Sequence, residues 1–239
     1  MSDITRTEKI KIIKTSFEKF NKDNDFYFLK PTLIIKDNYD IAHYLIIAPR
    51  FNRTVCDIVA QPLYIPESTF SLNISTRLQQ LGETHCFPWG RCTNSVIEYS
   101  KDIEEILQIF SEYGLQWLSY FDSPQHIIDS ANNWNLSKYQ FPWIQEKRNE
   151  VIAISSLYLG DIEKGIFILK KLQDDVSDSI SFSQRIEKWL RLAQNESERL
   201  PEIFDEIVLT TRKNLKLKDE KCELLNKRQE EQINSIILP

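Results

Sequence analysis

Apolar and polar residues alternate along this chain with two different periods. Between residues 4 and 22, apolar side chains recur every three or four positions, at Ile10, Ile13, Phe17 and Phe20. This is the period of one face of an α-helix, so the segment is predicted to be a helix that packs on the rest of the protein. From residue 26 to residue 74 the period falls to two, and β-branched and aromatic residues dominate. That pattern predicts four strands, at 26–36, 39–51, 54–65 and 69–74.

The connections between these predicted strands are short and rich in turn-forming residues, as in KDNYD, PRFNR and PES. Short connections favour antiparallel neighbours, so a meander is expected, with one face covered by the first helix. Pro31, Pro49 and Pro62 each remove a donor from the hydrogen-bond ladder. They are expected at edges, bulges or strand ends.

Helical periodicity returns in the second half of the chain. A helix capped by Ser100 or Asp102 is predicted to stop at Gly114, and a short one to begin at Ser123 and Pro124. Two amphipathic segments within 144–173 predict a helical hairpin that turns at Gly160. Further helices are predicted at 181–200 and from Pro201 to about residue 232.

The chain is therefore expected to have an α+β fold. An antiparallel sheet of four or five strands, covered by helices, is predicted for residues 1–130. An all-helical region, made of the hairpin 144–173 and two further helices, is predicted for residues 131–239.

Composition narrows the function classes. Hydrophobic residues make up 41% of the 239 positions and aromatic residues 11%, which is typical of a folded globular protein. A net charge of −5 lacks the positive field that captures phosphate backbones, so nucleic-acid binding is not expected. With five glycines and no glycine-rich phosphate-binding motif, no nucleotide or other cofactor is expected.

Localisation follows from the same sequence. The polar amino terminus has no apolar core of the kind that signal peptides carry, and no apolar run is long enough to span a bilayer. A cytoplasmic protein without membrane contact is expected. Its four cysteines are then expected to be reduced thiols.

Residues 83–92, ETHCFPWGRC, hold the densest group of reactive side chains. His85 and Cys86 are adjacent and Cys92 follows six positions later, which is not a usual zinc-ligand spacing, so no metal site is expected. Arg91 and His85 would give Cys92 the basic surroundings that activate a thiol. An alternative function is therefore a thiol- or carboxylate-dependent hydrolase that uses Cys92, His85 and Asp57.

The same loop is also consistent with a packed turn or with a recognition surface. Phe87, Pro88 and Trp89 would anchor a packed loop, whereas tryptophan and arginine are the residues that dominate interface energies. If the protein is a binding module, the expected contact residues are Trp89, Arg91, Trp117 and Tyr120.

One resemblance favours the binding module. The stretch DIVAQPLYIPESTFSLNISTRL, the tripeptide PWG and the stretch GLQWLSYFDSPQHI resemble bacterial α+β families of unknown function, over residues 5–130. Some members of those families lie beside toxin genes as immunity proteins. The resemblance implies a non-enzymatic protein that neutralises a partner, such as a basic toxin or effector, by steric occlusion.

Overall fold

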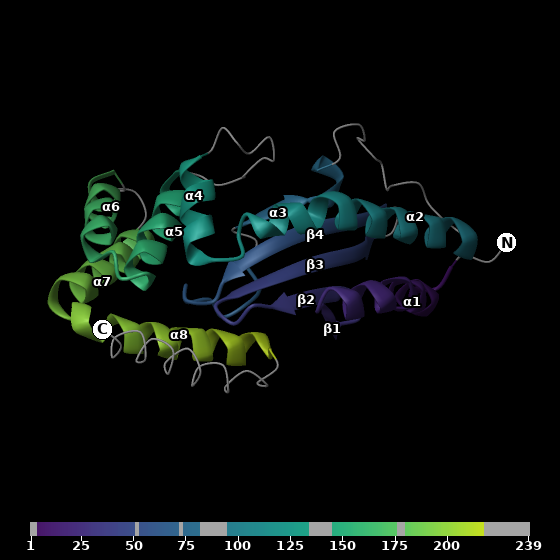
Figure 1. The fold of residues 1–239 in the computed structure, drawn as a ribbon, viewed down its shortest axis with the longest axis horizontal. Helices are drawn as coiled ribbons and strands as arrows, with labels where there is room; N and C mark the ends of the chain where they lie inside the picture. The colour runs from purple at the N-terminus through teal and green to yellow at the C-terminus, as the bar shows by residue number, and fades with distance from the viewer. Residues whose placement is uncertain are drawn as a thin grey trace, which may run out of the picture.

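The computed structural model of this chain describes residues 4–50, 53–71, 74–81, 95–133, 145–175 and 180–217. The described part has the predicted α+β fold, with an antiparallel sheet followed by helices (Figure 1). In these ranges the sheet has five strands in the order β1-β2-β3-β4-β5. Their bounds are Tyr27–Lys30, Leu33–Asp37, Ile41–Arg50, Arg53–Pro62 and Ser75–Arg77.

The first helix, α1 (Arg6–Asp23), covers one face of the sheet as expected (Figure 1). It begins with a capping box, in which Thr5 Oγ1 accepts a hydrogen bond from the Glu8 amide and the Glu8 carboxylate accepts one from the Thr5 amide. Ile13 and Phe17 are fully buried. The same face of the sheet is covered by α2 (Val96–Ile109), which packs beside α1.

The sheet differs from the predicted one at two places. The segment 26–36 is not one strand but a hairpin, because Pro31 lacks an amide donor and forms the turn between β1 and β2. Residues 69–71 lie outside the ladder, and the last strand begins only at Ser75. The carbonyls of Thr69 and Ser71 instead accept hydrogen bonds from the side chains of Gln61 and Tyr44.

The helices after the sheet follow the expected order. They are α3 (Leu115–Ser119), α4 (Pro124–Asn132), α5 (Gln145–Tyr158), α6 (Ile162–Asp175), α7 (Ile180–Asn195) and α8 (Leu200–Leu215). The hairpin of α5 and α6 turns at Gly160, whose φ of 83° is the left-handed conformation that glycine adopts most easily. Ser123 caps α4 as predicted, and Ser95 rather than Ser100 or Asp102 caps α2.

The last helix is shorter than the periodicity predicts. It ends at Leu215, because Lys216 takes the left-handed conformation with a φ of 58° and its amide turns back to the carbonyls of Arg212 and Lys213. Leu217 is then buried against the core. The predicted continuation from residue 218 to residue 232 lies outside the described residues.

One core connects the sheet with the later helices, across residue 130. Tyr64, which follows β4, is fully buried and its hydroxyl lies 2.8 Å from Ser155 Oγ in α5. Its ring stacks on Tyr158 with 4.2 Å between centroids, and both rings meet Phe204 of α8 edge to face. Figure 1 shows α8 running back from the helical hairpins along the sheet.

A π-helical segment, η2 (Phe110–Gly114), joins α2 to α3, so Gly114 does not stop the helix as predicted. Gly114 ends η2 and directly precedes α3. The helices α2 and α3 lie end to end as a nearly continuous rod along the sheet (Figure 1). A Cβ atom at this position would overlap the Phe110 ring and come within 3.0 Å of Ile58. The glycine is needed for close packing of the rod on β4 and not for a turn.

Replacing Gly114 with alanine is therefore expected to lower the free energy of unfolding by about 1–3 kcal/mol, because Phe110 must move within a filled core. Urea unfolding of the purified variant measures this. The control is Gln116→Ala on the exposed side of the same rod, expected to change stability by less than about 0.5 kcal/mol. Equal effects of the two substitutions would contradict the packing role of Gly114.

Candidate functional site

Five of the predicted site residues belong to the loop 83–92. His85, Cys86, Trp89, Arg91 and Cys92 all lie outside the described residues. The thiol chemistry and the loop part of the binding surface therefore stay predictions.

Asp57, the carboxylate in the alternative hydrolase hypothesis, lies within the described residues. Asp57 lies in β4, 25% exposed, with its Oδ1 3.9 Å from Arg77 Nε in β5. An exposed pair at this distance contributes little to stability.

The other two predicted contact residues, Trp117 in α3 and Tyr120 immediately after it, lie close together in the chain but differ in exposure. Trp117 is 3% exposed and packs on Phe121, with 4.7 Å between ring centroids, so it belongs to the core. Tyr120 is 45% exposed. Of this pair, Tyr120 presents its ring to solvent and Trp117 supports the helix from below.

Tyr120 ends a row of exposed positions on the outer side of α2, η2 and α3. These positions recur at intervals of four and all are exposed, so each lies next to the following one along the rod. Tyr113, which is 38% exposed, lies beside them. We call this surface the acidic helix face; its residues are Glu104, Gln108, Glu112, Tyr113, Gln116 and Tyr120.

The charge of the chain is concentrated on this part of the molecule. Residues 96–133 contain seven aspartates and glutamates and one lysine, a net charge of −6 with His126 neutral, whereas the whole chain carries −5. The remaining residues therefore sum to +1. Glu112 is held in the row by a 3.0 Å hydrogen bond from Gln108 Nε2. Tyr113 and the glutamates were not among the predicted contacts, although a count of charge along the chain would have indicated them.

Two polar contacts, the first of them buried, hold the residues that follow α3. His43, on β3, is 3% exposed and its Nε2 lies 3.0 Å from the Phe121 carbonyl oxygen. Ser130 Oγ in α4 donates to the Tyr120 carbonyl at 2.9 Å. Burial lowers the pKa of His43 to about 4, although the bond to Phe121 opposes this, so the imidazole is neutral near pH 7. A neutral ring donates from Nε2 to that carbonyl.

Cys56 is the one cysteine within the described residues, and its surroundings are those of a structural thiol. It is fully buried in β4. Burial, together with the charge of Asp57, raises the pKa of the thiol well above its ordinary value. The thiol form is therefore favoured and the nucleophilic thiolate disfavoured.

In the described ranges, no three or more His, Cys, Asp or Glu side chains are arranged to hold a metal ion. None of the described helices combines the length and hydrophobicity that a bilayer-spanning segment needs. Comparison with known protein families, curated proteins and solved structures gives no match for this chain.

Proposed function

We propose that this protein is a non-enzymatic binding module that neutralises a basic partner protein by covering it, in the manner of a bacterial immunity protein. The observation that carries the proposal is the segregation of charge. The negative charge of the chain gathers on residues 96–133, where the acidic helix face exposes two tyrosines.

The negative charge and the exposed tyrosines have separate roles in binding. A surface of one charge sign attracts a partner of the opposite sign, speeds its encounter and disfavours partners of like charge. Tyrosine then supplies contact area at low cost in conformational entropy, and its hydroxyl can bond across the interface. Because buried residues hold the rod, Tyr113 and Tyr120 are pre-positioned for a partner.

Photo-crosslinking in an extract of the source cells tests the proposal. Benzoyl-phenylalanine is placed at Tyr120 in one variant and, as a matched control, at Phe167 of α6, which is 71% exposed. The expected result is one adduct with a basic protein from position 120 and none from position 167. Adducts of equal yield from both positions, or an acidic protein at position 120, would contradict the proposal.

Charge neutralisation then tests the mechanism on the captured partner. Glu104→Gln/Glu112→Gln is expected to weaken binding about tenfold at low salt and to reduce its salt dependence, because two carboxylates of the acidic helix face are lost. The control pair, Glu163→Gln/Glu198→Gln, removes exposed charges from α6 and the segment before α8. Calorimetric titration gives both affinities. If the two double variants lower the affinity equally, net charge and not the acidic helix face determines binding, which would contradict the proposed mechanism.

A further inference from the structure

The outer side of α8 carries an ordered row of side chains. Its members are separated by four, three and four positions, and all are exposed. In a regular α-helix such spacing places them in one line along the helix. We call this surface the α8 row; its residues are Glu202, Glu206, Leu209 and Lys213. The row is acidic near the start of the helix, apolar in the middle, where Leu209 is 44% exposed, and basic near the end.

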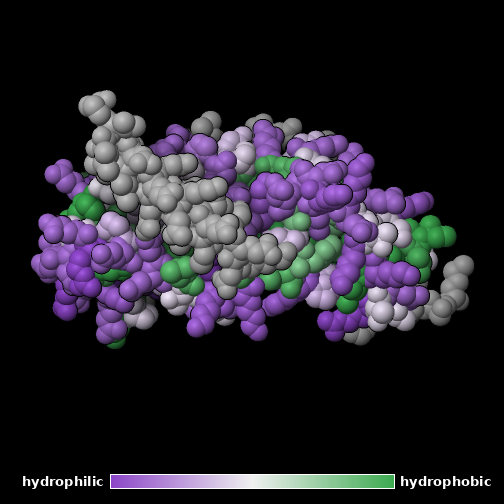
Figure 2. Space-filling model, turned by 60° about the horizontal axis from the view of Figure 1, so that its bottom comes forward, coloured by the Kyte–Doolittle hydropathy of each residue, from purple (hydrophilic) through white to green (hydrophobic). Residues whose placement is uncertain are grey.

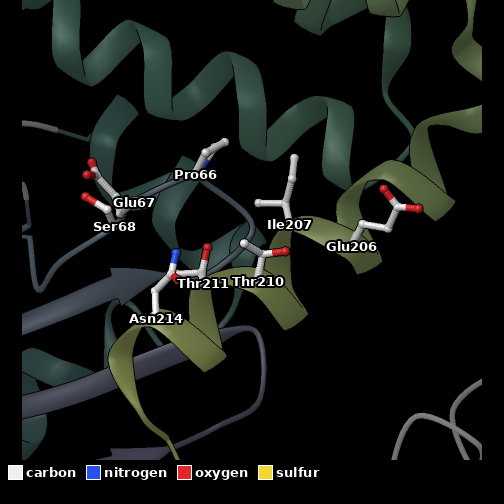
Figure 3. A pocket seen from close by; sticks show the side chains of 8 residues that line it. All are labelled: Pro66, Glu67, Ser68, Glu206, Ile207, Thr210, Thr211 and Asn214. Atoms are coloured by element: carbon white, nitrogen blue, oxygen red, sulfur yellow. The ribbon is translucent and has the colours of Figure 1, made fainter.

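A groove of about 460 Å³ borders the α8 row on one side (Figure 3). Its walls are residues 66–68, which follow β4, and the side of α8 that carries Ile207. Leu209 is two positions from Ile207, about 200° around the helix, so the apolar member of the row points away from the groove. The described part of the face in Figure 2 is mainly hydrophilic, with apolar residues in separate patches. An element that docks on the row must therefore match its charges and not only bury apolar area.

The chain leaves α8 at a fixed point. The Lys216 amide donates to the Lys213 carbonyl and the Leu217 amide donates to the Arg212 carbonyl, both at 3.1 Å. These two bonds, with Lys216 in the left-handed conformation, close the helix in a Schellman motif. Leu217 is 6% exposed and packs on the core. The residues that follow Leu217 in the sequence are therefore attached beside the basic end of the α8 row.

The sequence after Leu217 complements the α8 row. Its helical periodicity extends to about residue 232, and Glu220, Leu224 and Lys227 are separated by four and three positions, which is the spacing of one helix face. Along the chain these residues are acidic, apolar and basic. From its end toward its start, the α8 row is basic, apolar and acidic at the same separations. The two rows therefore match in charge and spacing when they run antiparallel.

We propose that residues 220–227 dock on the α8 row as an antiparallel helix. The facing pairs are Glu220 with Lys213, Leu224 with Leu209 and Lys227 with Glu206. Leu224 comes seven positions after Leu217 and Leu209 eight before it, so on two helices that rise about 1.5 Å per residue both lie about 10–12 Å from the turn. Exposed ion pairs are individually weak, but attachment at Leu217 makes the contact intramolecular and raises the effective concentration of the segment. The proposal is independent of the proposed function, since the α8 row shares no residue with the acidic helix face.

Backbone amide relaxation, measured by NMR on the full chain, tests the proposal. A docked segment shares the rigidity of α8, so order parameters of about 0.85 are expected for residues 220–227. The same values are expected after tenfold dilution, because the contact lies within one chain. Order parameters below about 0.6 in the wild type would overturn the proposal. A fall in these values on dilution would also overturn it, since the α8 row would then bind the segment of a second copy.

Charge reversal identifies the surface on which the segment docks. Glu206→Lys/Lys213→Glu keeps the net charge and is expected to lower the order parameters of residues 220–227 below about 0.6, with unchanged amide shifts in the sheet. Adding Glu220→Lys/Lys227→Glu is expected to restore them, because both ion pairs form again with opposite signs.

The matched control is Glu163→Lys/Lys170→Glu, which reverses two exposed charges on α6 and is expected to leave residues 220–227 rigid. The proposal is wrong if reversal on α8 leaves the segment rigid, if the fourfold variant does not restore its rigidity, or if reversal on α6 releases it equally.

Discussion

Replacing Arg212 with methionine is expected to lower the free energy of unfolding by about 3–5 kcal/mol, the cost of leaving a buried charge without its partner. Arg212 and Asp37 have side chains that are 5% and 7% exposed, and two N–H···O contacts of 2.7 Å join them. Burial disfavours the charged guanidinium, but the hydrogen bonds and charge of Asp37 raise its pKa above the ordinary value. The pair is thus ionised and shielded from water.

The Arg212→Met substitution removes more than one contact. Arg212 joins α8 to β2, and its partner Asp37 lies 175 positions earlier in the sequence. Its guanidinium also lies over the Tyr39 ring, 5.2 Å from the centroid. Urea unfolding of the purified variant measures the change. Lys213→Met, an exposed neighbour on the same turn, is the control and is expected to change stability by less than about 0.5 kcal/mol.

A double variant separates the lost charge from lost packing. Asp37→Asn together with Arg212→Met removes both charges and keeps an acceptor for the Tyr39 amide, which lies 2.9 Å from Asp37 Oδ1. It is expected to recover most of the stability, since uncharged replacements of a buried pair are often neutral. If the double variant is as unstable as Arg212→Met alone, packing and not charge explains the loss.

His43 is expected to make stability pH-dependent by about 2–3 kcal/mol, lost as the pH falls from 6.5 toward 4. Above pH 6.5 the ring is neutral in the folded and the unfolded chain, so its contribution is complete. Below that pH the unfolded chain binds a proton, which burial prevents the folded chain from binding until about pH 4. The unfolded state therefore gains stability as acid is added.

The hydrogen-bond partners of His43 fit a neutral ring. Asn38 Nδ2 lies 3.5 Å from the Nδ1 atom and Phe121 O lies 3.0 Å from Nε2, so a neutral ring with its proton on Nε2 satisfies both. The charge of Lys36 also disfavours protonation, whereas Asp122 favours it. Burial is the largest of these effects.

Urea unfolding from about pH 7 to about pH 4.5, for the wild type and His43→Gln, measures the effect. Subtracting the two curves removes the carboxylates that titrate in both proteins. The difference should shrink by about 2–3 kcal/mol on acidification. His126→Gln is measured alongside for comparison, because the His126 side chain is 54% exposed. A constant difference between wild type and His43→Gln would show that His43 is not the buried titrating group.

The local parts of this fold could be predicted from the sequence, and the errors have identifiable causes. Ile13 and Phe17 mark the buried face of α1 because an amphipathic period is a local property. The strand predicted at 69–74 fails because Gln61 and Tyr44 take the carbonyls that a ladder would use. Gly114 was predicted as a helix stop because its packing partner, Ile58, lies in a distant strand.

The candidate sites were predicted less well for the same reason. Trp117 and Tyr120 were both predicted to be contact residues, since both are aromatic and close in the chain. Trp117 packs on Phe121 and is buried, whereas Tyr120 is exposed. In the sequence, Arg212 is one of several charged residues within the last predicted helix. Its burial depends on Asp37, which no local pattern connects to it.

The sequence by itself determined the order of helices and strands, the α+β class and the acidic character of the chain. Hydrophobic periodicity depends on residues close together in the chain, and net charge depends on composition alone. Only the tertiary structure decided which polar groups are buried, which tyrosines reach solvent and which walls form the groove. Those outcomes depend on contacts between residues far apart in the chain, where burial changes the energy of a charge or hydroxyl by several kcal/mol.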